Sequence, residues 1–68
     1  MVTLGEALPL ECQRVRELKE IYLALPQGVG RFAALLMEKA LQQADKAMIE
    51  GDTVAMLRIY QELQGFTK

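Results

Sequence analysis

The sequence contains no histidine, serine, asparagine or tryptophan, and it has a single cysteine, Cys12. Catalytic triads of the serine-histidine or cysteine-histidine kind therefore cannot be assembled. One cysteine excludes an intrachain disulfide, and without histidine a structural zinc site lacks a suitable set of ligands. We expect no catalytic residue, no metal site and no cofactor, and we predict that the protein is not an enzyme.

Cys12 is the one side chain with nucleophilic potential. Arg16 follows it by one turn of a predicted helix, and the cysteine lies near the start of that helix; both features lower the pKa of a thiol. The alternative is that Cys12 is a small apolar residue at the edge of the helix, and we favour this interpretation.

The sequence also lacks an excess of charge of either sign. Eight basic and nine acidic residues are interleaved and leave a net charge of −1, so there is no general attraction to nucleic acid or to an anionic membrane. The sequence has no run of about 18 apolar residues, and residues 1–10 lack the basic start and apolar stretch of a signal peptide. We expect a cytoplasmic protein with no membrane partner and a free thiol.

The chain is short for its apolar content. Its 68 residues fall below the roughly 70 to 80 at which one core supplies comfortable stability, yet 51% of them are hydrophobic. With disulfide and zinc excluded, oligomerisation is the remaining way to stabilise such a chain. We therefore predict a homodimer.

The most informative stretch is residues 31–50. Its apolar residues recur at helical spacing and cover an arc of about 160°, wider than the stripe of a little over about 100° that an ordinary surface helix shows. Such a helix is flanked by two elements, or by one element and a second copy of the chain. Ala40 and Ala44 lie on this arc, and we predict that they are interface residues.

An earlier helix is predicted over residues 9–25. Pro9 suits the first position of a helix, and Pro26 ends it because the residue before a proline avoids the helical region. Residues 1–7 show no periodicity and are expected to form a flexible N-terminal arm. The breaker-rich connector at 26–30 has the length that joins antiparallel helices, so we expect a helical hairpin.

A later helix is predicted over residues 53–64, after a long helix over 30–50. Gly51 suits the left-handed residue that closes one helix, and Asp52 suits the N-cap of the next. The chain 1–68 is therefore predicted to be a single all-α domain, a helical hairpin plus a third helix, assembled as a dimeric bundle.

Some apolar residues do not fit the predicted buried faces. In the third helix we expect Leu57 and Leu63 to face inward and Ile59 to face solvent. Tyr22, Phe32, Tyr60 and Phe66 have the spacing of core anchors. Five apolar residues on so small a body would point to water, which favours an interface: they are Leu23, Leu35, Ile49, Val54 and Ile59.

Glu11 and Arg14 are polar residues on the apolar side of the first predicted helix. Three residues apart, they can pair with each other. The alternative is that they meet partners across a dimer interface, where a desolvated ion pair fixes the register of the two chains. We include both among the candidate interface residues.

Residues 28–33 match the pattern G-x-G-x-x-A of dinucleotide-binding folds. That motif requires a preceding strand and a βαβ unit, and residues 8–25 fit a helix better. We therefore interpret the two glycines as part of a flexible hairpin loop. A weaker alternative is that their amides, together with Arg31, hold a phosphate or a carboxylate at the start of the next helix.

Five segments of the sequence resemble a group of short proteins encoded by Mu-like transposable phages and prophages. The resemblance covers residues 8–64, and the segments are ECQRVREL at 11–18, Pro26 with Gly28, ADKA at 44–47, Gly51-Asp52, and MLRIYQEL at 56–63. No activity and no functional residues are assigned to that group. The resemblance implies a setting in which small accessory proteins of temperate phages bind a host protein and block it, anti-activators of host transcription being one type.

We therefore predict a non-enzymatic protein-interaction module, a phage-encoded or prophage-encoded modulator or inhibitor that binds a host protein such as a transcriptional regulator. Its expected partners are a second copy and a host protein, in the host cytoplasm. The alternative is a small DNA-associated regulator. The helix-Gly-Asp-helix segment invites this comparison, but residues 53–64 offer only Arg58, beside Glu62, as a basic side chain for bases. Nucleic acid is therefore not an expected partner.

Overall fold

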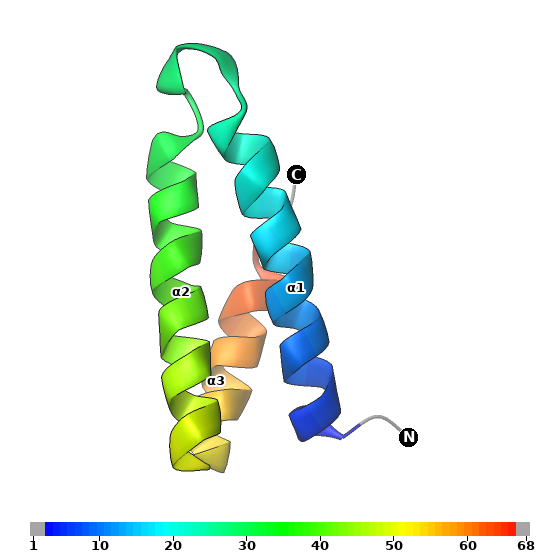
Figure 1. Cartoon of the computed structure of the whole chain (residues 1–68). Helices are drawn as coiled ribbons and strands as arrows, with labels where there is room; N and C mark the ends of the chain where they lie inside the picture. Colours follow the sequence, from blue (N-terminus) through cyan, green and yellow to red (C-terminus); the bar gives the residue numbers. More distant parts are fainter. Residues whose placement is uncertain (1–2, 67–68) are drawn as a thin grey trace.

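A computed structural model describes residues 3–66 of the chain, and this part contains helices and turns but no strand. Helix α1 spans Leu4–Leu23, a short 3₁₀ turn η1 spans Pro26–Gly28, α2 spans Arg31–Glu50 and α3 spans Thr53–Gln64. Helices α1 and α2 form an antiparallel hairpin, and α3 packs against both (Figure 1). The predicted all-α hairpin with a third helix is confirmed.

Helix α1 starts earlier than we predicted. Residues 4–7, expected to belong to a flexible arm, form its first turn, and the carbonyl of Thr3 accepts hydrogen bonds from the amides of Glu6 (3.0 Å) and Ala7 (2.8 Å). Pro9 lies inside the helix, where it removes only the bond to the carbonyl of Gly5. The burial of Leu8 holds this turn against the core. Residues 1–2 lie outside the described part.

The core is built from one face of each helix. Its largest fully buried side chains are Leu8 and Val15 from α1, Met37 from α2 and Leu63 from α3. The alanines predicted at the centre of the long helix, Ala40 and Ala44, are also buried, and they are buried within this one chain. Helices α1 and α3 together cover most of the wide apolar stripe of α2, but Leu36 of this stripe stays 42% exposed. The two alanines are not available as interface residues.

Helix α3 is rotated from its predicted orientation. Ile59 is buried in the core while Leu57 is about half exposed, the reverse of the prediction. Apolar residues occur nearly all around this short helix, so its periodicity does not determine which side faces inward. The rotation depends instead on tertiary structure: the tight turn at Gly51 and Asp52 precedes α3, and Arg14 contacts its last turn.

The turn between α2 and α3 follows its predicted chemistry. Gly51 adopts a left-handed conformation with φ of 67°, and the carboxylate of Asp52 accepts a 3.1 Å hydrogen bond from the amide of Ala55. The amide of Asp52 also donates to the carbonyl of Ala47 (3.0 Å). This short connection places α3 directly against the end of the hairpin that is far from the α1–α2 loop.

The hairpin loop depends on close backbone approach. Gly30 is buried, and a Cβ atom at this position would collide with the backbone of Tyr22. Because α1 precedes this loop where a strand would be required, the G-x-G-x-x-A pattern does not form a dinucleotide-binding turn. None of the helices in residues 3–66 combines the length and the apolar composition needed to cross a membrane.

Candidate protein-interaction surface

Cys12 is a core residue and lies away from any open site. Only 1% of its surface is exposed, and burial raises the pKa of its thiol, although nearby Arg16 acts in the opposite direction. The thiol therefore stays protonated and shielded from solvent. Residues 3–66 also contain no group of three or more acidic or cysteine side chains placed to hold a metal ion.

Glu11 and Arg14 pair with each other in the structure, as one of the two predicted alternatives had it. Arg14 does more than pair, because its guanidinium also donates to the backbone carbonyls of Leu63 (2.8 Å) and Phe66 (3.0 Å). Leu63 lies in the last turn of α3, where its carbonyl also accepts a 3.1 Å hydrogen bond from the amide of Phe66, and Phe66 follows the end of the helix. Arg14 therefore anchors the end of α3 to α1, a role that spacing within the first helix did not predict.

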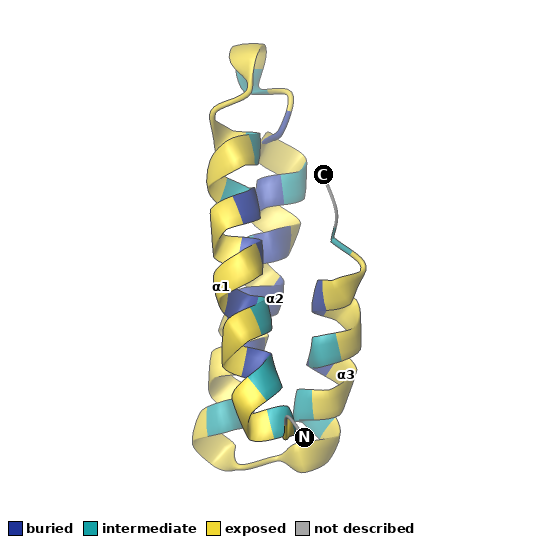
Figure 2. Cartoon of the chain, turned by 90° about the vertical axis from the view of Figure 1, so that its right-hand side faces the viewer, coloured by how far each residue is buried: buried dark blue, intermediate teal, exposed yellow. Residues whose placement is uncertain are grey.

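Helix α3 covers only part of the hairpin. Its 12 residues span about 18 Å at 1.5 Å per residue, whereas the molecule is 39 Å long. Figure 2 shows α3 beside the end of the hairpin far from the loop, and no other described element lies beside the loop end. Among residues 3–66, therefore, nothing covers the part of this face that continues from α3 toward the loop.

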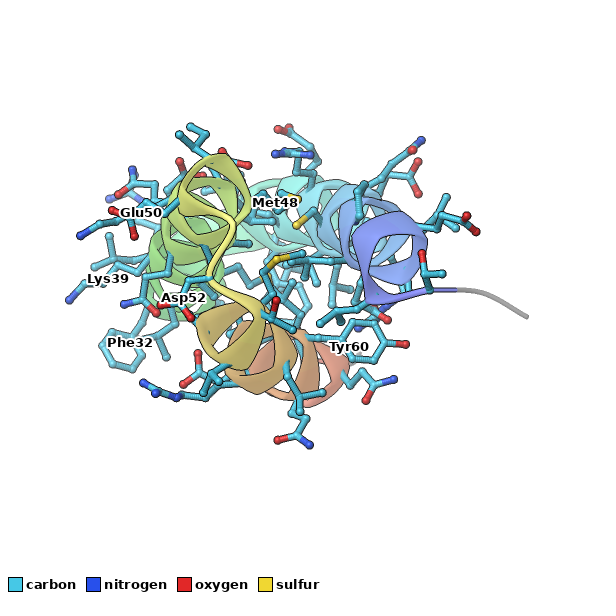
Figure 3. All side chains as sticks on the ribbon, turned by 90° about the horizontal axis from the view of Figure 1, so that it is seen from below. Phe32, Lys39, Met48, Glu50, Asp52 and Tyr60 are labelled. Carbon is cyan, nitrogen blue, oxygen red and sulfur yellow. The ribbon has the colours of Figure 1, made fainter. Side chains whose placement is uncertain are left out.

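Four apolar side chains mark this uncovered face, which we call the loop-end surface. Their exposed fractions are 44% for Ile21, 40% for Leu25, 71% for Phe32 and 42% for Leu36. Ile21 and Leu25 are one helical turn apart along α1 and its end, and Phe32 and Leu36 are one turn apart along α2. In Figure 3, which looks along the helices, Phe32 projects outward from α2 toward the side on which α3 lies.

A shallow groove joins the loop-end surface to the end of α3. It has a volume of about 360 Å³, and Leu36 and Phe66 supply its apolar walls. Lys39 and Glu62 line it as well. Leu36 therefore lies next to the last turn of α3, which makes the exposed surface continuous with the core contacts made by α3.

Charged residues are nearly absent from the loop end. Between Ala24 and Met37 the only charged residue is Arg31, whose side chain lies against Gly28. At the opposite edge of the loop-end surface, Glu62 lies near Lys39 in the groove, and Glu17 lies near Arg14 and Ile21 on α1. Neither acid forms an ion pair with any described residue, whereas Arg14 is paired with Glu11. The surface is thus apolar at its centre, basic at the loop and mainly acidic at the α3 edge.

The predicted interface residues fall into two groups. Four of the predicted apolar residues are exposed as expected, namely Leu23, Leu35, Ile49 and Val54. Ile59 is buried, like the two alanines, and Glu11 and Arg14 serve the contact between α1 and α3. The exposed predicted residues do not form one surface. Leu35, for example, points to a different side of α2 from the adjacent Leu36, which belongs to the loop-end surface.

Phe32 corrects another prediction. It was expected to be a core anchor, but it is the most exposed aromatic residue of the described part, while Tyr22, Tyr60 and Phe66 pack against the core as predicted. The signal that could have located the loop-end surface is the tract 24–37, which has a single charged residue and whose structure exposes five large apolar residues.

Comparisons of the chain with protein-family models, with curated proteins and with solved structures found no match.

Proposed function

We propose that this protein is a non-enzymatic protein-interaction module and that it binds its protein partner through the loop-end surface. The observation that carries the proposal is the exposure of Phe32 and Leu36 on a face that already packs a helix at its other end. Exposed apolar patches with polar rims are typical of sites that contact other proteins.

The composition of the loop end supports a protein as the ligand. The centres of protein interfaces are depleted in charged residues and enriched in aromatic ones, and a few buried anchors contribute most of the binding energy. Phe32 has the exposure and the position of such an anchor, and its neighbours Ile21 and Leu36 are apolar. A nucleic acid would need a basic surface, whereas this tract carries only Arg31.

The resemblance to accessory proteins of Mu-like phages suggests the identity of the partner. On that basis we propose that the ligand is a host protein, such as a transcriptional regulator, and that the protein modulates or inhibits it in the host cytoplasm. The proposal assigns no catalytic step to this chain.

The experiment is affinity capture from a bacterial host lysate, followed by direct titration of the purified captured protein. The Phe32→Glu and Leu36→Glu variants should lose capture, because each introduces a charge into the contact. Ile49→Glu is the matched control, since Ile49 is 86% exposed on α2 and lies outside the loop-end surface. Equal capture by all three variants would show that the partner binds elsewhere.

A further inference from the structure

We infer that a second copy of this chain occupies the loop-end surface, in an antiparallel, twofold-symmetric arrangement. The inference rests on the proposed function in one respect, that the loop-end surface binds protein. It adds the identity of the molecule that covers this surface when no other partner is bound, and the orientation in which it does so.

Continuity with the α3 contact is the first support. The loop-end half of the hairpin presents the same face of α1 and α2 on which α3 lies, and Leu36 shares a groove with Phe66 at the junction. The uncovered part is about 20 Å long, since α3 takes about 18 Å of a 39 Å molecule. In an antiparallel pair, the loop of one copy reaches the end of α3 in the other, and each loop end fills the layer that α3 leaves vacant.

Charge distribution is the second support. A twofold axis through the middle of the loop-end surface brings the loop of one copy to the α3 edge of the other. Arg31, the only charge of the loop end, then approaches Glu17 and Glu62, which have no ion-pair partner in the described part of the chain. Lys39 lies at the same edge, but the two acids outnumber it, and Arg14 is already held by Glu11 and the end of α3.

The small size of the contact limits its strength. A standard interface buries about 800 Å² of each partner, which is about one sixth of the 4821 Å² surface of this chain. The uncovered face is only about 20 Å long on a molecule at most 22 Å across, so it is smaller than that and the dimer belongs to the weak and transient class. We expect a Kd on the order of micromolar and rapid exchange. Such a dimer protects Phe32 from solvent and still releases it to a competing partner.

The first test is sedimentation velocity of the full chain at protein concentrations up to about 500 µM. The wild-type mass should rise from 7.6 kDa toward twice that value. The Phe32→Glu and Leu36→Glu variants should remain monomeric, while Ile49→Glu should dimerise like the wild type. Circular dichroism of each variant shows that the helices are retained. A wild-type chain that stays at 7.6 kDa, or a dimer lost only with Ile49→Glu, would overturn the inference.

Charge exchange tests the antiparallel arrangement. Arg31→Glu makes the loop and the α3 edge both acidic, and the double variant Glu17→Lys with Glu62→Lys makes both basic. Each protein alone should dimerise about tenfold more weakly. An equal mixture of the two should regain wild-type association, because each loop then meets an oppositely charged edge. A mixture that associates no better than its components would rule out the antiparallel dimer.

Failure of this inference is distinguishable from failure of the proposed function. If the wild type is monomeric but Phe32→Glu still loses the captured host protein, the second copy is the wrong occupant and the protein-binding role stands. If the dimer forms through the loop-end surface and capture is unaffected by Phe32→Glu, the self-association is right and the host-binding role of this surface is wrong.

Discussion

The guanidinium of Arg14 in α1 donates a 2.8 Å hydrogen bond to the backbone carbonyl of Leu63 in the last turn of α3. The same side chain pairs with Glu11 and reaches the carbonyl of Phe66 at 3.0 Å. A cation at this position adds charge-assisted hydrogen bonds to carbonyls at the C-terminal end of α3 and complements the negative end of the helix dipole. It therefore ties the end of α3 to α1, beside the place where the loop-end surface begins.

Substitution Arg14→Met should loosen the end of α3. It removes two charge-assisted hydrogen bonds from a partly exposed site, so we expect a loss of about 1 to 2 kcal/mol in the free energy of unfolding by urea. Hydrogen exchange at the last amides of α3 should accelerate. Arg16→Met is the control, because Arg16 makes only an exposed 3.5 Å contact with Asp45 and its loss should cost under about 0.5 kcal/mol. Equal effects of the two variants would contradict the anchoring role of Arg14.

Gly30→Ala should destabilise the hairpin. A Cβ atom at Gly30 would meet the carbonyl oxygen and α-carbon of Tyr22, which are backbone atoms that cannot rotate away. We expect a loss of about 1 to 3 kcal/mol by urea unfolding, the usual range for overpacking. Gly5→Ala is the matched control. Gly5 is exposed inside α1 with open space around it, so alanine there should raise stability by about 0.5 to 1 kcal/mol. If both changes moved stability in the same direction, the close approach at Gly30 would be misassigned.

The two longer helices and the turn between α2 and α3 could be predicted because their local signals agree with their tertiary contacts. Gly51 adopts a left-handed conformation and Asp52 caps α3, so the local chemistry alone is enough there. The start of α1 was misplaced because Pro9 resembles a first helical residue, whereas the burial of Leu8 extends the helix to Leu4.

The candidate site was harder to predict. Whether Phe32 is buried depends on how far α3 reaches along the hairpin. The local sequence around Phe32 contains no information about the length of α3. The rotation of α3, which buries Ile59 and exposes Leu57, likewise depends on tertiary contacts. The width of the apolar stripe on α2 correctly required two covering elements, but it did not distinguish a third helix of the same chain from a second copy.

Cys12 should react with thiol reagents only after unfolding. Its side chain is buried in the core, and burial raises the pKa of the thiol, so both access and the thiolate fraction are low. We expect at least about a hundredfold slower labelling by a disulfide reagent in buffer than in concentrated urea. The Cys12→Ala variant, which labels under neither condition, gives the background rate. Rapid labelling of the native protein would mean that the contact between α1 and the core opens readily.

The ion pair between Lys19 and Glu38 should make stability depend on pH. The ammonium of Lys19 donates a 2.7 Å hydrogen bond to Glu38, and this bond is the main reason why the pKa of Glu38 is lowered from 4.5. Because the folded-state pKa is depressed, the stabilisation is present above the unfolded pKa and is lost as pH falls through the folded value. Glu38→Gln should therefore be less stable than the wild type by urea unfolding at pH 7, and the difference should shrink below about pH 4.5. Glu17→Gln is the control, since Glu17 makes no ion pair with a described residue and its removal should have little effect at either pH. A Glu38→Gln penalty of equal size at pH 7 and pH 3 would show that the side chain acts through packing rather than through its charge.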